Sequence, residues 1–172
     1  MVYLDIKSPC RLRIAGAPEN RIETAPPPDY VAATPERIPL LKTKLLARTG
    51  DRVKIGTPLY AHKKNTDIVF AAPGAGSVVD IKYGPRRIIR EIIIRLDDAE
   101  SHEPFRAYNN GHIDRLSRSE LINALLKGGL WPFIQDIVYR VIADPTDTPA
   151  VLWVPLDNSD PFHPPAPVYL ET

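Results

Sequence analysis

The stretch 49–83 repeats one pattern twice, a glycine-centred turn followed by a short run of β-branched residues. The first turn is centred on Gly50 and the second on Gly74. Glycine takes the positive φ of a tight turn that most other residues resist. Two turn-and-strand units so close together predict strands folded over one another in a small barrel-like sandwich rather than an open helical layer.

The alternation of side chains along a strand predicts which residues face the inside of this sandwich. Gly76 is expected to let three of the following side chains point inward: Val79, Ile81 and Tyr83. A strand over 37–48 is expected before the stretch, and a long strand over 87–96 after it. The face of that last strand is expected to carry Ile88, Ile92, Ile94 and Leu96.

The motif Gly-Asp-x-Val-x-x-Gly-x-x-Leu followed by Ala-Pro-x-x-Gly-x-Val, at 50–59 and 72–78, resembles the biotinyl/lipoyl-type barrel-sandwich hybrid fold. Domains of that type carry a cofactor on a lysine between the two halves. Here Asn65 stands at the expected distance before Ala72, and Lys63 and Lys64 do not. We therefore expect no covalently bound cofactor, and an exposed hairpin whose lysines block edge pairing.

The chain divides by composition and pattern into four parts. We interpret residues 1–36 as an arm, 37–97 as the barrel-sandwich hybrid, 98–145 as a connecting loop with a capped helix, and 146–172 as the first strand of a truncated α/β domain. Proline, at 19 residues, is concentrated toward both ends, where polyproline geometry favours chain that wraps a surface. The predicted fold class is mainly β (α+β).

One helix is strongly indicated after the sandwich. Ser117 and Glu120 have the spacing of a capping box, in which their side chains satisfy free backbone N–H groups at a helix start. Apolar residues over 121–126 then form one helical face, and Gly128 with Gly129 ends the helix. Residues 135–143 fit either a second short helix or a strand.

The charge pattern argues against nucleic acid as a partner. The formal net charge is +1, so the field of the whole protein favours neither nucleic acid nor anionic lipid. The basic residues cluster around one expected hairpin: Lys82, Arg86, Arg87, Arg90 and Arg95. Acidic residues interleave with them and no aromatic stacking platform accompanies them, which favours a mixed-sign surface or an interface with another protein.

No catalytic or metal constellation stands out. The densest group of candidate metal ligands is His102, Glu103, His112 and Asp114, which solvated loop residues explain more simply. Cys10 is the only cysteine, so an internal disulfide is excluded and an inert thiol is the default. No window approaches the ~20 apolar residues of a membrane span, and the N-terminus lacks the apolar run of a signal peptide.

Several stretches in order resemble the NqrA component of the bacterial sodium-translocating NADH:quinone reductase. They run from Ile14-Ala-Gly-Ala-Pro-Glu and Gly50-Asp-Arg-Val-Lys through Lys63-Lys-Asn and Arg86-Arg-x-Ile to Leu116-Ser-Arg and Gly129-Leu-Trp. The resemblance implies a peripheral subunit on the cytoplasmic face of the inner membrane. Its implied partners are integral membrane subunits that carry flavins, with an iron–sulfur centre on a partner as well, and ubiquinone at the end of the electron path.

The resemblance also suggests where contacts form. Trp131, Phe133 and Tyr139 are our candidates for a contact with quinone or a partner subunit, and the alternative is a core plug under the sandwich. The family's Arg-Pro-Phe segment after this tryptophan is replaced here by Pro132-Phe133-Ile134. We expect no redox catalysis by the chain alone, and the chain is either an excised N-terminal piece or a short relative.

Three further interpretations stay open. The first is a stand-alone barrel-sandwich module for protein–protein contact. The second is the similar subunit of the ferredoxin-linked relative of this pump, which needs clustered cysteines that Cys10 alone does not supply. The third is a carrier of a lysine-bound cofactor.

Overall fold

A computed structural model describes residues 23–108 and 110–152. The chain forms two compact units, Pro27–Asp147 and a second one made of Met1–Pro26 and Thr148–Thr172. The described part of the second unit is limited to 23–26 and 148–152. Everything that follows concerns the first unit.

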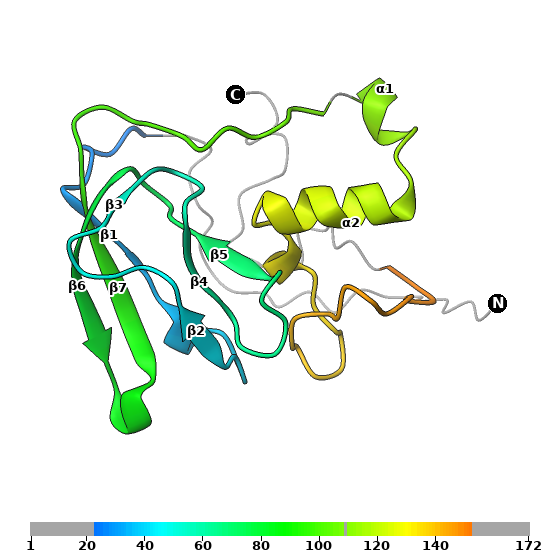
Figure 1. Ribbon diagram of the computed structural model, residues 1–172, viewed down its shortest axis with the longest axis horizontal. Coiled ribbons are helices and arrows are strands. Elements are labelled where there is room, and N and C mark those ends of the chain that lie inside the picture. Colours follow the sequence, from blue (N-terminus) through cyan, green and yellow to red (C-terminus); the bar gives the residue numbers. More distant parts are fainter. Residues whose placement is uncertain (1–22, 109, 153–172) are drawn as a thin grey trace, which may run out of the picture. The chain divides into compact units, whose positions relative to one another are not determined.

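The first unit is built mainly from short strands (Figure 1). The strands are β1 (Tyr30–Ala33), β2 (Thr43–Leu45), β3 (Arg52–Val53), β4 (Pro58–His62), β5 (Val69–Ala71), β6 (Gly76–Tyr83) and β7 (Ile89–Leu96). The α-helices are α1 (Asn110–Ile113) and α2 (Arg118–Lys127), and the 3-10 turns are η1 (Pro35–Arg37), η2 (Pro85–Arg87) and η3 (Trp131–Phe133).

The strands form two antiparallel sheets. The larger sheet has the order β1-β7-β6-β3, and the smaller one has the order β2-β4-β5. The edge strand β1 lies inside the segment interpreted as an arm, and it pairs Tyr30 with Arg95 through to Ala33 with Ile92. The mainly β class predicted from the turn pattern is confirmed.

The two glycine turns join the halves of the sandwich through backbone hydrogen bonds. Gly50 has φ +95° and its N–H donates to the carbonyl oxygen of Val78 at 2.8 Å. Gly56 has φ +96° and its N–H donates to the carbonyl oxygen of Ala72 at 3.1 Å. Each turn of the first half is therefore bonded to the second half, and a side chain at either position would strain the backbone.

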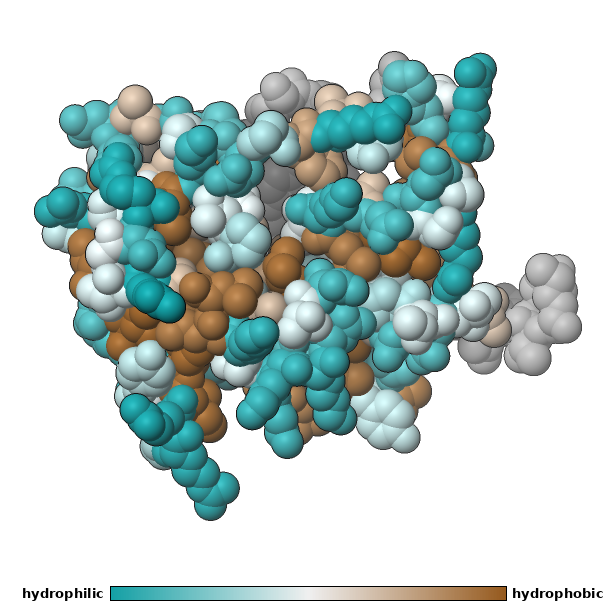
Figure 2. Space-filling model, viewed as in Figure 1, coloured by the Kyte–Doolittle hydropathy of each residue, from teal (hydrophilic) through white to brown (hydrophobic). Residues whose placement is uncertain are grey.

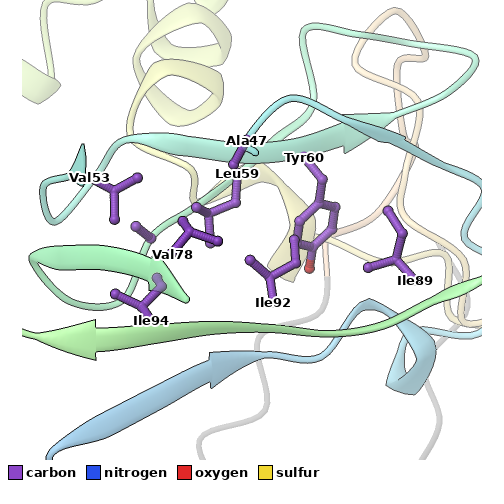
Figure 3. Packing of buried hydrophobic residues seen from close by; sticks show 9 residues of the cluster. Ala47, Val53, Leu59, Tyr60, Val78, Ile89, Ile92 and Ile94 are labelled. Carbon is purple, nitrogen blue, oxygen red and sulfur yellow. The ribbon is translucent and has the colours of Figure 1, made fainter. Parts of the chain in front are cut away.

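The hydrophobic core lies between the two sheets, where side chains from β4 and β7 point toward each other (Figure 3). Leu59, Ile92 and Ile94 have no measurable exposure. The Tyr60 ring is 4% exposed and stacks on Phe70 at 4.4 Å between ring centroids. Burial raises the pKa of Tyr60 to about 12, because the charged phenolate is poorly solvated there.

A bulge in β6 corrects the expected inward-facing residues. Val78 pairs with Ile94 and Asp80 pairs with Ile93, so Val79 is an extra residue without a partner. Val78 is consequently buried, whereas Val79 is exposed. Of the three side chains expected to point inward, Ile81 alone packs against the core, because Tyr83 is exposed as well.

A second bulge, in β7, corrects the burial expected for Ile88. Lys82 pairs with Glu91 and Tyr83 pairs with Ile89, so Arg90 is the extra residue. This shift turns Ile89 into the core and leaves Ile88, which precedes the strand, half exposed. Strand β7 begins at Ile89, because the 3-10 turn η2 occupies the first residues of the expected strand 87–96.

Beyond the sandwich the capped helix is confirmed as α2, and the one-turn helix α1 precedes it in the region expected to be irregular. Residues 135–143 form neither of the two expected elements but a loop closed by a bridge between Gln135 and Ile142. The prediction that 146–172 opens a further domain stays a prediction, because most of that segment lies outside the described residues.

Candidate functional site

The start of helix α2 is fixed by a reciprocal capping box. The Glu120 N–H donates to the Ser117 hydroxyl oxygen at 3.3 Å, and the Ser117 N–H donates to a Glu120 carboxylate oxygen at 2.9 Å. The Ser117 side chain and then its backbone N–H hold the pKa of Glu120 below its usual value. The carboxylate is therefore ionised and capping throughout the neutral range.

The end of α2 directs the chain that follows it. Gly129 has φ +67°, its N–H donates to the Leu126 carbonyl oxygen at 3.1 Å, and the Leu130 N–H donates to that of Leu125 at 2.9 Å. This pair of bonds is the Schellman pattern of helix ends. A Cβ on Gly129 would lie 3.5 Å from the Ala71 side chain, so this turn packs closely against β5.

Trp131 lies at the base of the segment that leaves the helix. Its ring is 7% exposed, and its Nε1–H donates to the carbonyl oxygen of Ala143 at 2.8 Å. A buried indole N–H needs a partner, and here the partner is twelve residues further along the chain. Trp131 therefore closes the loop 134–143 by holding its far end.

The loop 134–143 is closed by backbone bonds and by the side chain of Asp136. The Ala143 N–H donates to Ile134 at 3.0 Å, and the Asp136 N–H donates to Val141 at 2.8 Å. The Asp136 carboxylate in turn accepts from the N–H groups of Val138 at 2.9 Å and Tyr139 at 2.8 Å. These bonds define one conformation for the turn, as aspartate does in Asx-type turns.

Large apolar side chains point outward from this closed turn. We define the apolar loop as residues 133–139. Its four large exposed apolar residues are Phe133 at 80%, Ile137 at 70%, Val138 at 74% and Tyr139 at 73% exposure. On the face shown in Figure 2, hydrophobic residues likewise break through a largely hydrophilic surface in several places. Clustered exposed apolar residues of this size typically mark a contact site.

The three sequence-predicted contact residues thus separate. Trp131 is inside and supports the loop, whereas Phe133 and Tyr139 are among its exposed members. Sequence reasoning missed Ile137 and Val138. The signal that could have found them was a run of three apolar residues directly after Asp136, a residue that favours turns.

Asn65 lies in the turn between β4 and β5, where related folds place a lysine. Its N–H donates to His62 Nδ1 at 3.1 Å, and its side-chain oxygen accepts from the Asp67 N–H at 3.2 Å. The side chain of Asn65 is therefore turned back onto its own hairpin. Lys63 and Lys64 beside it are exposed.

The candidate metal ligands are involved in other contacts. His102 forms a parallel bridge with Ile55, and a Glu103 carboxylate oxygen accepts from the Thr57 hydroxyl at 2.9 Å. His112 lies in α1. Within 23–108 and 110–152, no group of three or more histidine, cysteine, aspartate or glutamate side chains is arranged to hold a metal ion.

The basic hairpin is partly neutralised from within. Lys82 Nζ lies 3.0 Å from Glu91 Oε2, and the hydrogen bond from Lys82 holds the pKa of Glu91 below its usual value. Arg90 Nε lies 3.0 Å from Glu36 Oε2. In the part of the chain that the structure describes, each helix is too short or too polar to cross a bilayer.

The sequence also matches known proteins over most of its length. The family model of the NqrA N-terminal barrel-sandwich hybrid domain matches residues 4–97. The A-type subunit of the Na(+)-translocating NADH-quinone reductase from Tolumonas auensis is 32% identical over 98% of this chain and 38% of its own length. The same protein from Pseudomonas aeruginosa is 34% identical, over 92% of this chain and 36% of its own length.

A third relative, from a Marinomonas species and of the same name, is 30% identical over 88% of this chain and 34% of its own length. The chain thus spans little more than a third of the curated relatives it matches. The family model covers the glycine turns, both sheets and the whole core between them. The chain therefore belongs to the family of NqrA N-terminal barrel-sandwich hybrid domains.

Proposed function

We propose that this chain is an accessory part of a membrane NADH:quinone reductase that couples electron transfer to sodium export. The observation that carries the proposal is the match with relatives named as the A-type component of that reductase, over 98% of the chain in one case. The proposed place of the chain is peripheral, on the cytoplasmic face of the membrane. Flavins and iron–sulfur are assigned to partner subunits.

The contact to the quinone end of the complex is assigned to the apolar loop. Phe133 and Tyr139 present flat aromatic faces that suit an apolar ring or an apolar partner surface. Trp131 acts indirectly, because its hydrogen bond to Ala143 fixes the loop. No covalent cofactor is assigned, since Asn65 stands where a carrier lysine is expected.

Purification from native membranes tests the proposal. The chain, tagged in its host, is expected to copurify after mild detergent extraction with flavin-bearing membrane proteins and with sodium-stimulated NADH:quinone reductase activity. Recovery of the chain without these proteins would contradict the proposal. The purified chain alone is expected to oxidise no NADH, and NADH oxidation without added flavin would show that it is itself catalytic.

Photo-crosslinking tests the place of contact. A photoreactive quinone analogue added to the assembled complex is expected to label residues 131–142. A variant with Phe133→Ser and Tyr139→Ser is expected to lose most of that labelling while assembly is scored separately. Labelling confined to other parts of the chain would remove the loop from the quinone end.

The exposed loop also supports a second candidate, a module for protein–protein contact outside any redox complex. Four large side chains at 70–80% exposure favour an apolar partner of whatever function. The copurification experiment separates the two candidates. A partner that carries neither flavin nor quinone-reductase activity would favour the interaction module.

A further inference from the structure

The end of the β6–β7 hairpin, residues 83–88, is a second unusual surface, separate from the apolar loop. In Figure 1 this hairpin end stands away from the other strands of its sheet. Residues 85–88 are all exposed, and Tyr83 is 53% exposed. The hairpin therefore ends in a short projection that contains both cationic and apolar side chains.

The cations of this projection differ in their partners. Lys82 and Arg90 are engaged by Glu91 and Glu36, as described above. Arg86 and Arg87 form no ion pair with another residue of the described ranges. Two adjacent guanidinium groups are thus left uncompensated at the outermost turn, although the net charge of the whole chain is only +1.

The backbone holds these two arginines in an uncommon conformation. Arg86 has φ +56° and Arg87 has φ +59°, in the left-handed region that non-glycine residues rarely occupy. Leu40, next to the same hairpin, has φ +57° and is 81% exposed. Strained positions of this kind are typically retained where they serve a contact.

An apolar groove lies beside the arginines. It has a volume of about 220 Å³ and is lined by residues that include Ile38, Leu40, Leu41 and Ile88. Leu40 and Ile88 are at least half exposed at its rim. Cationic groups next to exposed aliphatic and aromatic side chains are the combination found on surfaces that enter a membrane interface.

We propose that the hairpin end, residues 83–88 together with Leu40, binds the surface of an anionic lipid bilayer. Arg86 and Arg87 contact acidic headgroups, and Leu40, Tyr83 and Ile88 enter the interface beside them. An acidic protein partner fits less well, because a stable protein interface buries roughly 800 Å² on each side, far more than this small projection offers. A nucleic acid would leave the aliphatic side chains without a role.

Sedimentation with vesicles tests this assignment on the full chain. The chain is expected to bind vesicles that contain phosphatidylglycerol at low salt, and to bind neither pure phosphatidylcholine vesicles nor the anionic vesicles at high salt. The variant Arg86→Asn/Arg87→Asn keeps residues that tolerate positive φ and removes both charges. It is expected to lose about thirtyfold in partition coefficient, because each such cation contributes about fivefold.

The matched control is Lys63→Gln/Lys64→Gln, which removes two adjacent exposed cations from the other hairpin. It is expected to lose less than about threefold, since those lysines lie outside the proposed surface. Leu40→Asn, which also suits positive φ, is expected to weaken vesicle binding and to leave the salt dependence unchanged. Circular dichroism and thermal unfolding show that each variant is folded before its binding is compared.

Several outcomes would overturn the proposal. These are failure of the parent chain to bind anionic vesicles, equal losses in the two double variants, or binding of polyglutamate in place of vesicles. Competition by free glycerol phosphate at millimolar concentration would likewise assign the arginines to a soluble phosphate. The proposed function is independent of this result, because a chain that copurifies with the membrane subunits yet ignores vesicles keeps the first proposal and loses the second.

Discussion

The sandwich and the segment 117–143 dispose of their apolar side chains in opposite ways. In the sandwich Leu59 and Ile92 are fully buried between two sheets. In the apolar loop Phe133 and Val138 are at least 74% exposed, although the backbone around them is hydrogen bonded at both ends. Burial in the first region stabilises the fold, whereas the second region uses backbone and polar bonds to keep apolar groups available. Stability and contact should therefore respond to different substitutions.

The largest expected effect is a cavity in the sandwich. Ile92→Ala should lower the free energy of unfolding by about 3–4 kcal/mol, because the removed groups leave a hole between the sheets. Ile92→Val, which removes one methylene group, should cost about 1 kcal/mol. Urea unfolding followed by circular dichroism measures both. Equal, small losses would show that the sandwich core repacks freely.

The buried phenol of Tyr60 should make stability depend on pH in the alkaline range. Below about pH 10 the phenol is neutral in both states and contributes nothing to the pH dependence. Between pH 10 and 12 the unfolded chain releases the proton and the folded chain, with its pKa of about 12, keeps it. Stability therefore falls as pH rises, by up to about 2 kcal/mol at pH 12.

Tyr60→Phe isolates this contribution from that of the other titrating residues. The difference in unfolding free energy between the parent chain and Tyr60→Phe should be constant up to about pH 10 and then shift in favour of the variant. A difference that stays constant to pH 12 would mean that the ring is solvated in the folded state.

Loss of the helix cap should have an intermediate effect. Ser117→Ala removes the acceptor of the Glu120 N–H and should cost about 1 kcal/mol in urea unfolding. Ser117→Asp restores an acceptor and should recover most of the loss. An unchanged midpoint in the alanine variant would show that α2 is held by packing alone.

The smallest effect on stability is expected from the apolar loop. Phe133→Ser with Tyr139→Ser should change the unfolding free energy by less than about 0.5 kcal/mol, because both side chains are exposed. The same variant should lose most of its copurification with membrane partners. If the loop variant unfolds as readily as Ile92→Ala, the exposed side chains serve the fold and the contrast between the regions fails.

The sequence was a good guide where a local rule specifies the geometry. Positive φ at Gly50 and Gly56 follows from glycine itself, and the cap of α2 follows from the spacing of Ser117 and Glu120. The bulges at Val79 and Arg90 were not predictable, because strand alternation carries no mark of an extra residue in one partner. Each bulge reversed the predicted orientation of neighbouring side chains.

The site was predicted less completely than the fold. Trp131 and Phe133 are two residues apart in an aromatic run, and only the 3-10 turn with the bond to Ala143 separates a buried ring from an exposed one. The loop 134–143 has no period that a pattern could reveal, because backbone groups and one aspartate close it. Assignment of Phe133 and Tyr139 to a quinone or partner contact stays a prediction.

The close approach of Gly129 to Ala71 ties the aim of the apolar loop to the smaller sheet. Orientation is thus inherited: whatever shifts β5 also redirects the side chains displayed beyond α2. A bulkier residue at position 71 would act as a wedge, leaving every exposed contact residue unaltered in identity yet pointing elsewhere. Changes in binding can accordingly arise from a methyl group that never meets the partner.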